Sequence, residues 1–303
     1  MDCRGVTVAA GDRSNFLLDD PSGRPLFVRR TTDERLSIET EQGRVVQTLA
    51  GHDGGYVTCL ASDPGGARLA SGSSNRRVRL WDLASGACLR VLVGHTEDVN
   101  DVAWELGTGG RLASTSYDGT LCIWDAATGA LLHRRDPRAM AGYILAARPG
   151  GDLLASGWDD GTVRLWHWST GACVRVLDLH RKAVLDITAN AQWLVSTSMD
   201  GVLRVWSWEG RCVAESRDSN VDSLDWWGSR LVSIANPGPM CVWDTSSPRP
   251  DTWRCEVVLD DHPCLCRVLR DGRLMVAGYG APFLLAARTP RERRATRRAL
   301  ACM

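Results

Sequence analysis

Residues 77–95 read RVRLWDLASGACLRVLVGH, and related stretches recur along the rest of the chain. The copies are TLCIWDAATGALLHR at 120–134, TVRLWHWSTGACVRVLDLH at 162–180, VLRVWSWEGRCVAES at 202–216 and MCVWDTSS at 240–247. Their aligned tryptophans are 43, 42, 40 and 37 residues apart, at Trp81, Trp124, Trp166, Trp206 and Trp243. A period near 40 residues indicates a repeated supersecondary unit, because stacked copies bury the hydrophobic face that a single copy leaves open.

Each copy has the pattern of short β-strands. LASG, LAST, LASG, LVST and LVSI are apolar runs whose serine stands ten residues before the tryptophan. Turn residues follow each run, and VRLW, LCIW, VRLW, LRVW and MCVW then alternate toward the tryptophan. Such alternation predicts strands joined by tight turns. Four short strands in about 40 residues are typical of the blades of a β-propeller.

These residues resemble the WD-repeat family, and the resemblance covers the chain from about residue 5 to residue 287. In that family a histidine of a Gly-His pair, a serine or threonine, an aspartate and the tryptophan form a hydrogen-bonded tetrad in each blade. The resemblance implies tetrads here at His52, Ser71, Asn75 and Trp81; at His95, Ser114, Asp118 and Trp124; at Ser156, Asp160 and Trp166; and at His180, Ser196, Asp200 and Trp206. The first set has Asn in place of Asp, the third lacks a matching histidine, and the Trp243 unit has Pro237 where the aspartate belongs.

A histidine, a serine and an aspartate that lie close together also look like a hydrolytic triad. Their recurrence in successive units argues against catalysis, because an enzyme needs one such site. Buried polar atoms without partners cost about 1–3 kcal/mol each, and a closed network satisfies them. We therefore predict that the tetrads are structural, that the protein is not an enzyme, and that it uses no metal ion or cofactor.

The repeats predict the number of blades. Ile38 stands 43 residues before Trp81, so positions 38, 81, 124, 166, 206 and 243 mark six blades. CLCRVLRDG, RLMVAGYG and FLLAARTP, between residues 264 and 290, supply three strands of a seventh, and GVTVAA at residues 5–10 is one strand left over. We predict an all-β, seven-bladed β-propeller with four antiparallel strands per blade, closed when residues 5–10 form the outer strand of the last blade. Residues 1–287 then form one domain, and residues 288–303 form a basic C-terminal tail.

The composition is that of a soluble globular protein, with 303 residues, 44% hydrophobic and 24% charged. The 36 basic and 36 acidic side chains balance, so no whole-molecule field steers the chain to nucleic acid or anionic lipid. We find neither a run of about 18 apolar residues nor an apolar signal-like stretch after Met1, so we expect no membrane insertion and no secretion. Eleven scattered cysteines without a C-x-x-C pair fit a reducing compartment. We therefore expect an intracellular protein in the cytoplasm, with a nuclear location also open.

By the family pattern, the loops with the Gly-His pairs and the aspartate turns form one face around the propeller axis. Side chains beside these loops are expected to point outward and to bind partners. They are Tyr56, Asp98, Asn100, Tyr117, Trp158, Asp159, Met199, Asn220 and Asp222. Trp158 has two interpretations, a packing residue between blades or an exposed anchor. We place it with this face because aromatic side chains are enriched in binding hot spots.

The pattern predicts a non-catalytic scaffold that binds peptides or protein partners in a multiprotein complex. A substrate-recognition subunit of a ubiquitin ligase is one alternative. A propeller-framed enzyme that uses Asp98, Asp261 or His262 is another, although their spacing supports no mechanism. The stretch from Arg288 to Arg298 holds six arginines against one acid, Glu292, a local charge of 6 − 1 = +5. This tail is either a contact for nucleic acid or an acidic partner, or a solvated, frayed terminus.

Overall fold

The strands of this chain form antiparallel sheets. The computed structural model describes residues 15–19, 25–30, 35–40, 43–52, 54–107, 109–137, 139–217, 221–227, 229–235, 240–247, 249–259, 265–268, 274–277 and 283–285. Within these ranges, six sheets have four strands and one has three, and in each sheet consecutive strands pair antiparallel. The predicted all-β class with four-stranded antiparallel sheets is confirmed. The strand predicted at residues 5–10 and the basic tail at 288–303 lie outside the described residues, so closure by the N-terminal strand and nucleic-acid contact by the tail stay predictions.

The first three sheets follow one another along the chain. The first contains β1 (Asn15–Asp19), β2 (Pro25–Arg30), β3 (Leu36–Thr40) and β4 (Val45–Leu49). The second contains β5 (Val57–Ser62), β6 (Arg68–Ser73), β7 (Arg77–Asp82) and β8 (Cys88–Val93). The third contains β9 (Val99–Trp104), β10 (Arg111–Ser116), β11 (Leu121–Asp125) and β12 (Leu131–Arg135).

The remaining sheets continue the same order. The fourth contains β13 (Gly142–Ala147), β14 (Leu153–Trp158), β15 (Val163–His167) and β16 (Cys173–Leu177). The fifth contains β17 (Val184–Ala189), β18 (Trp193–Ser198), β19 (Val202–Ser207) and β20 (Cys212–Arg217). The sixth contains β21 (Val221–Trp227), β22 (Arg230–Ala235), β23 (Met240–Asp244) and β24 (Arg254–Leu259), with the short 3-10 helix η1 (Pro250–Thr252) before β24. The three-stranded sheet contains β25 (Leu265–Val268), β26 (Leu274–Ala277) and β27 (Phe283–Leu285).

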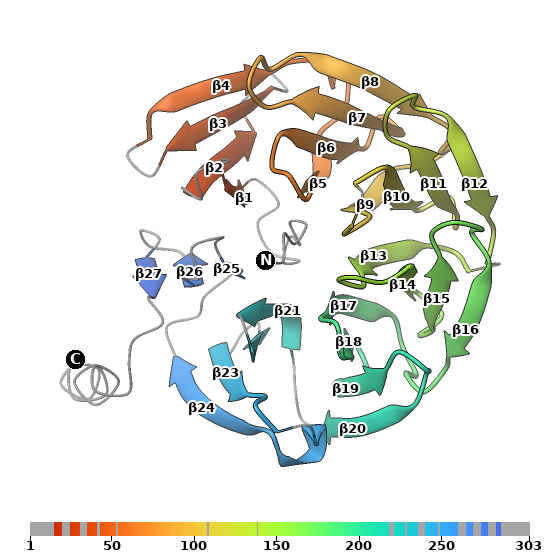
Figure 1. The fold of residues 1–303 in the computed structure, drawn as a ribbon, viewed down its shortest axis with the longest axis vertical. Coiled ribbons are helices and arrows are strands. Elements are labelled where there is room, and N and C mark those ends of the chain that lie inside the picture. Colours follow the sequence, from red (N-terminus) through yellow and green to blue (C-terminus); the bar gives the residue numbers. More distant parts are fainter. Residues whose placement is uncertain are drawn as a thin grey trace.

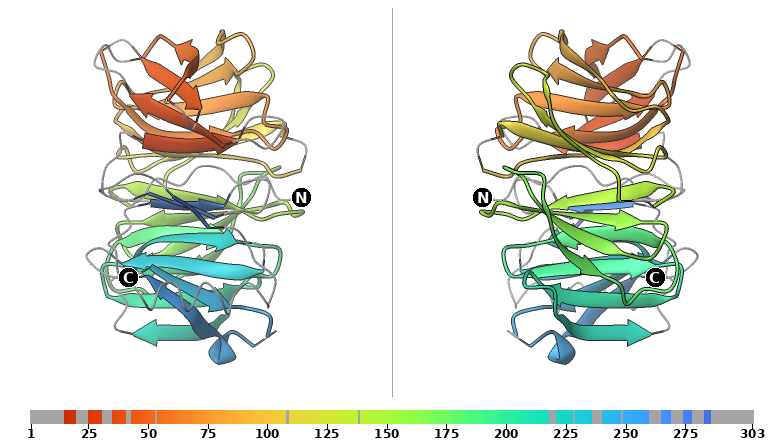
Figure 2. Two further views of the ribbon diagram at one scale, coloured as in Figure 1. Left: turned by 90° about the vertical axis from the view of Figure 1, so that its left-hand side faces the viewer. Right: turned by 90° about the vertical axis from the view of Figure 1, so that its right-hand side faces the viewer.

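The sheets stand around a common centre like the blades of a propeller (Figure 1). Strands β5, β9, β13, β17 and β21 lie nearest the centre, and β4, β8, β12, β16, β20 and β24 lie at the rim. Seen from the side, the strands run roughly along the short axis of the disc, so the turns gather on its two flat faces (Figure 2). Neighbouring inner strands contact one another from β5 through β9, β13 and β17 to β21.

Burial explains the small residues of the second strands. β6, β10, β14 and β18 are buried along nearly their whole length because a neighbouring sheet covers each of their faces. A strand buried on both faces reads as a continuous apolar run instead of an alternating one. A side chain on Gly72 would lie 2.4 Å from Cys59 Sγ and 2.7 Å from Val99 Cγ1. The glycine of this LASG run therefore allows the next sheet to approach.

Side chains of the outer strands also donate hydrogen bonds to the backbone of the following sheet. Gln47 Nε2 of β4 donates to the carbonyl oxygen of Ser85, and Arg90 Nε of β8 donates to that of Ala127. Arg135 Nε of β12 donates to the carbonyl oxygen of Gly171 over 2.8 Å. In each case the acceptor lies in the turn between the third and fourth strands of the next sheet. These contacts repeat along the chain and join consecutive sheets at the rim.

Two buried carboxylates join consecutive sheets near the centre. Asp101 Oδ2 of β9 accepts the backbone N–H of Leu145 in β13 over 2.7 Å, and Asp186 Oδ2 of β17 accepts that of Leu224 in β21 over 2.6 Å. Both side chains are buried, and each also accepts the N–H of the residue that follows it. Burial raises the pKa of Asp101 to about 7, against the opposing effect of its two N–H partners, and raises that of Asp186 well above its ordinary value.

This arrangement predicts a pH-dependent stability. A carboxyl whose pKa is higher in the folded state than in the unfolded state favours folding at low pH. Protonated Asp101 therefore adds to the free energy of unfolding below about pH 4. This added stability is lost as the pH rises toward 7, at up to about 1.4 kcal/mol per pH unit. Replacing Asp101 with serine, the residue at the same place in β21 (Ser223), is expected to flatten this slope in urea unfolding measured from pH 4.5 to 7.5. Cys59→Ser changes the same place in β5 and should leave the slope unaltered. Equal slopes for Asp101→Ser and the parent would contradict the prediction.

Candidate functional site

The tetrad residues of one sheet come from different elements and meet at a serine. In the third sheet His95 precedes β9, Ser114 lies in β10 and Trp124 lies in β11. Trp124 Nε1 donates to Ser114 Oγ over 2.9 Å, and His95 Nε2 lies 2.7 Å from the same oxygen. The bond from tryptophan to serine also occurs in the sixth sheet, where Trp243 Nε1 donates to Ser233 Oγ over 2.9 Å. The ten-residue spacing therefore places the tryptophan on the adjacent strand, diagonal to the serine: Trp124 pairs with Leu112, and Ser114 pairs with Cys122.

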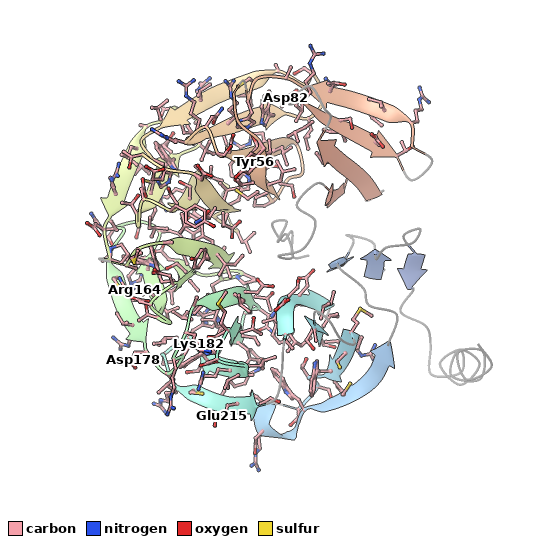
Figure 3. All side chains as sticks on the ribbon, turned by 180° about the vertical axis from the view of Figure 1, so that it is seen from behind. Tyr56, Asp82, Arg164, Asp178, Lys182 and Glu215 are labelled. Carbon is pink, nitrogen blue, oxygen red and sulfur yellow. The ribbon has the colours of Figure 1, made fainter. Side chains whose placement is uncertain are left out.

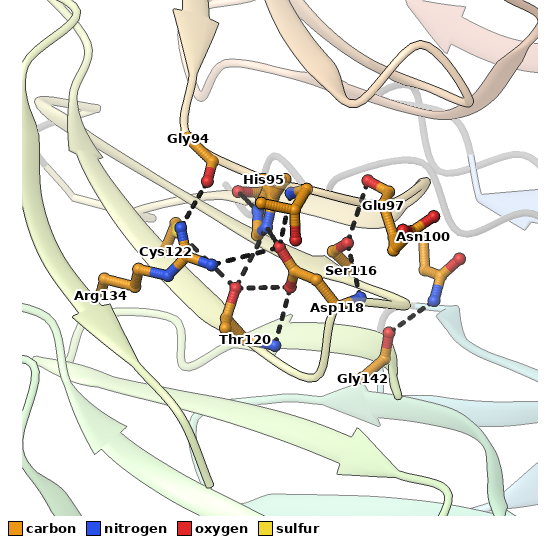
Figure 4. A network of polar contacts seen from close by, with 12 residues as sticks. Gly94, His95, Glu97, Asn100, Ser116, Asp118, Thr120, Cys122, Arg134 and Gly142 are labelled. Atoms are coloured by element: carbon orange, nitrogen blue, oxygen red, sulfur yellow. Dashed lines mark hydrogen bonds and ion pairs between the residues drawn. The ribbon is translucent and has the colours of Figure 1, made fainter. Parts of the chain in front are cut away.

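Asp118 completes this tetrad from the turn between β10 and β11 (Figure 4). Its carboxylate accepts the backbone N–H groups of Thr96 and Thr120, both over 2.9 Å, and lies 3.1 Å from His95 Nδ1. The Thr120 hydroxyl donates to it over 2.6 Å, and the Arg134 guanidinium lies 3.5 Å away. Burial alone would raise the pKa of Asp118, but the hydrogen bonds from His95, Thr120 and Thr96 hold it well below its usual range. The carboxylate is therefore charged and fully occupied by the fold.

The fifth sheet repeats this geometry. Trp206 Nε1 donates to Ser196 Oγ over 2.8 Å, and His180 Nε2 lies 2.8 Å from that oxygen. His180 Nδ1 lies 3.2 Å from an oxygen of Asp200, which also accepts from Arg204. Burial opposes ionisation of Asp200, but hydrogen bonds and the neighbouring His180 lower the pKa of its carboxyl to about 2.

The second sheet has a reduced version. Trp81 Nε1 donates to Ser71 Oγ over 2.8 Å, and His52 Nε2 lies 2.6 Å from it. Asn75 occupies the turn position of the aspartate, and its Oδ1 accepts the backbone N–H of Arg77 over 3.2 Å. An uncharged side chain thus holds the turn that a carboxylate holds in the third and fifth sheets.

The fourth sheet replaces its missing histidine with a tryptophan. Trp158 is 0% exposed, and its Nε1 donates to Ser156 Oγ over 2.7 Å. Trp166 Nε1 donates to the same oxygen over 2.7 Å. The Arg164 guanidinium lies 5.6 Å from the centre of the Trp158 ring and donates to Asp160 over 2.8 Å. An indole and a guanidinium therefore close this network.

The placement of Trp158 on the partner-binding face was wrong. Trp158 ends β14 two residues after Ser156, so both side chains point to the same side of the strand. The equivalent positions in other sheets hold Ser73, Ser116 and Ser198, small polar residues whose hydroxyls accept turn N–H groups. The absence of a histidine in this unit, together with a large donor two residues from the serine, was the signal that indicated this role.

Where the structure describes them, the other predicted face residues lie at the starts of first strands and in the turns between second and third strands. Backbone bonds join these two regions within each sheet: Ser74 N–H to Tyr56 O, Tyr117 N–H to Asp98 O, Asp159 N–H to Ala141 O, and Met199 N–H to Ala183 O. This regular pairing places Tyr56, Tyr117, Asp159 and Met199 on one face of the disc. Figure 3 shows Tyr56 nearer the centre, whereas Asp178 and Glu215 lie at the rim.

A depression of about 280 Å³ opens among the inner strands β5, β9, β13 and β17 and their adjoining loops. We call it the central depression. It is lined by Thr58, Cys59, Asn100, Asp101, Tyr117, Tyr143, Ile144, Ala183, Val184, Leu185 and Met199. Four sheets contribute to it, so its shape depends on how the sheets pack around the centre.

Three predicted face residues line the central depression: Asn100, Tyr117 and Met199. Sequence reasoning missed Tyr143 and Asp101, because each reads as an ordinary residue of a first strand. The rings of Tyr117 and Tyr143 meet edge to face, with centroids 5.9 Å apart and planes at 84°. Burial raises the pKa of Tyr143, and Tyr117 and Asp159 add to the shift.

The other predicted face residues that the structure describes, Tyr56, Asp98, Asp159 and Asp222, are not among the lining residues of the depression. Asp98 Oδ2 accepts from the Tyr56 hydroxyl at 3.5 Å, and Asp159 Oδ1 accepts the backbone N–H of Met140 at 3.1 Å. Asp222 is half-buried in β21, and burial raises the pKa of its carboxyl. Asn220 lies outside the described residues, as do Asp261 and His262.

A family model described as "WD domain, G-beta repeat" matches residues 43–82, 86–125, 142–167 and 171–207. Each matched segment ends just after one of the aligned tryptophans, and each of those tryptophans donates to the serine of its own sheet. The chain belongs to the WD-repeat family. The repeat seen in the sequence and the tetrads seen in the sheets are therefore the same feature.

Curated WD-repeat relatives share short parts of the chain. The F-box/WD repeat-containing protein 7 of Drosophila melanogaster is 43% identical over 56 residues, 18% of this chain and 4% of that protein. The nuclear distribution protein PAC1 of Arthroderma benhamiae is 41% identical over 61 residues, 20% of this chain and 13% of that protein. The chain thus matches only a small part of the length of either relative.

A solved structure extends the likeness of this WD-repeat chain to most of its length. A chain in the crystal structure of the mitotic checkpoint complex aligns with a TM-score of 0.76. The alignment covers 91% of this chain and 89% of that chain at 21% sequence identity. At that identity the comparison shows the fold alone.

In the ranges that the structure describes, no three His, Cys, Asp or Glu side chains are grouped so as to hold a metal ion. Within the same ranges, no helix has the length and apolar character needed to cross a bilayer.

Proposed function

We propose that this WD-repeat chain is a non-catalytic scaffold that binds peptide or protein partners on the face around its central depression. The observation that carries the proposal is the exposure of Tyr56, Tyr117 and Met199 on that face, at 48%, 43% and 60%. Aromatic and methionine side chains on a rigid surface supply large contact areas for a partner. The tetrad histidines, serines and aspartates bond to one another, so these groups serve the fold.

The form we propose for the scaffold is a closed, seven-bladed propeller in a multiprotein complex inside the cell, in the cytoplasm or the nucleus. The sheet of β25, β26 and β27 has three strands in the described residues, whereas the other six sheets have four. An outer strand from residues 5–10 beside β27 would complete it and remove a free edge. The scattered cysteines support a reducing compartment.

A second candidate is the substrate-recognition subunit of a ubiquitin ligase. The similarity to an F-box/WD repeat-containing protein favours it, over 18% of this chain. Affinity purification followed by mass spectrometry tests this role, since ligase subunits would co-purify with the chain. Their absence from the purified complexes would remove this candidate and leave the scaffold proposal intact.

The scaffold proposal predicts that one face carries the contacts. Replacing Tyr117, Asp159 and Met199 together with alanine is expected to remove most co-purifying proteins, because exposed anchor residues carry most of the binding energy of an interface. The measurement is quantitative affinity purification of the full chain from cells. Circular dichroism and thermal unfolding check that the variant is folded.

A matched control changes three exposed residues away from that face. Leu131 and Val176, on outer strands at the rim, are 42% and 53% exposed, and Glu209 lies in an exposed turn on the opposite face. Their triple replacement by alanine should leave the set of partners unchanged. If both triple variants keep the same partners as the parent chain, this face is not the binding surface.

A further inference from the structure

The described lining of the central depression offers acceptors and aromatic rings. None of the eleven side chains that the structure describes there is Lys, Arg or His. Thr58 Oγ1 donates to the carbonyl oxygen of Val99, and Asn100 Nδ2 donates to that of Gly142. Asn100 Oδ1 is buried, and no donor in the described part of the chain reaches it. An occupant that satisfies this oxygen must therefore bring a hydrogen-bond donor.

The tyrosine pair suits a cation. Tyr117 and Tyr143 both line the depression, and their edge-to-face contact holds the two rings in a fixed relation. The face of an aromatic ring carries partial negative charge and attracts ammonium and guanidinium groups. Tyr143 is half-buried, so a cation against its ring would be partly shielded from water.

Carboxylates strengthen this preference. Asp98 stands two residues before Asn100, with its carboxylate 3.5 Å from the Tyr56 hydroxyl. Asp159 acts on Tyr143 closely enough to raise the pKa of its hydroxyl together with burial. Asp98 and Asp159 place negative potential around the depression, which favours a positive occupant over an anion or a neutral side chain. Asp101 in the lining is not counted with them, because burial raises its pKa to about 7.

The basic side chains of this face lie outside the lining. Arg76 is in the turn between β6 and β7, and Arg181 and Lys182 are in the loop before β17. None of these three side chains belongs to the described lining of the depression. The volume of about 280 Å³ lies just below the range of about 300–1,000 Å³ typical of small-molecule pockets, which suits one side chain of a larger partner.

We propose that the central depression receives a cationic side chain, the ammonium of a lysine or the guanidinium of an arginine, from the protein partner. The inference rests on the proposed function, in which the same face binds that partner. Tyr117 and Tyr143 would contact the cation through their rings, and Asp98 and Asp159 would supply the opposite charge. A carboxylate or a carbonyl oxygen in the same place would face Asn100 Oδ1 as another acceptor.

The test uses side-chain probes and the methyl signal of Met199. Met199 lines the depression, whereas Met140 is 83% exposed and lies outside the lining, so their carbon-13 methyl signals report the site and a reference. The probes are the N-acetyl, N-methylamide derivatives of arginine, lysine, citrulline, norleucine and glutamate, titrated to about 10 mM. Arginine or lysine should shift the Met199 signal, and uncharged citrulline should bind about tenfold more weakly than arginine. The comparison of arginine with lysine identifies which cation the site prefers.

Charge variants complete the test. Asp98→Asn and Asp159→Asn should each weaken binding of the preferred cation about three- to tenfold, and Tyr143→Leu should do the same by removing a ring. Glu209→Gln removes a charge on the opposite face and should leave binding unchanged. Equal binding of arginine and citrulline, a preference for norleucine or glutamate, or no Met199 response to either cation would overturn the inference. If the Tyr117, Asp159 and Met199 triple variant loses partners while the cations fail to bind, the scaffold proposal stands and this inference falls.

Discussion

Replacing Asp118 with alanine is expected to lower the free energy of unfolding by about 3–5 kcal/mol. The Asp118 carboxylate accepts two backbone N–H groups and the Thr120 hydroxyl, and it lies beside the buried His95 ring. Alanine would leave the donors of the buried residues Thr120 and His95 without this acceptor. Urea unfolding followed by circular dichroism at pH 7 measures the loss. Because the pKa of Asp118 is lowered in the fold, the stabilisation is present above about pH 4 and is lost in strong acid.

The second sheet provides the control for Asp118. Asn75 occupies the same turn position, and its side chain accepts one backbone N–H, that of Arg77. Asn75→Ala should therefore cost about 1 kcal/mol, the usual value for a single turn hydrogen bond. Similar losses for Asp118→Ala and Asn75→Ala would show that the carboxylate network contributes little beyond the turn itself.

Replacing Trp158 with alanine is expected to cost about 3–5 kcal/mol, the range for removing a large buried aromatic side chain. Trp158 is fully buried, donates to Ser156 and lies beneath the Arg164 guanidinium. Trp158→Phe keeps most of the packing and loses the N–H donor, so it should cost about 1–2 kcal/mol. Thermal unfolding of both variants measures the packing and hydrogen-bond contributions separately.

An exposed residue serves as the control for Trp158. Met140 is 83% exposed, so Met140→Ala should change the free energy of unfolding by no more than about 0.5 kcal/mol. If Trp158→Ala behaved like Met140→Ala, the indole would not replace the missing histidine of the fourth sheet.

The repeats made most of the fold predictable. A serine ten residues before each tryptophan places the two residues diagonally on adjacent strands, where the indole reaches the hydroxyl, as in Ser114–Trp124 and Ser196–Trp206. Regular spacing identifies such positions because the same local packing recurs in each sheet. The prediction failed at Trp158. In that unit the indole of Trp158 bonds to the serine hydroxyl that a histidine contacts in other sheets.

The central depression was only partly predictable. Loop residues such as Tyr117 and Met199 could be assigned to it from their place beside the tetrads. Tyr143 could not, because the depression brings it together with residues of β5, β9 and β17 that are far away in sequence, and its exposure depends on how four sheets meet. Asp101 reads as a polar residue of an alternating strand, and its burial follows from the approach of the next sheet to β9.

The buried carboxylates of Asp101 and Asp186 also have a calorimetric consequence. Both side chains retain protons in the fold at pH values where an unfolded aspartate has released them. Melting near pH 6 therefore delivers hydrogen ions to the buffer, and the heat of that transfer adds to the heat of melting. Scanning calorimetry should give a smaller apparent enthalpy in an amine buffer, whose protonation is exothermic, than in phosphate.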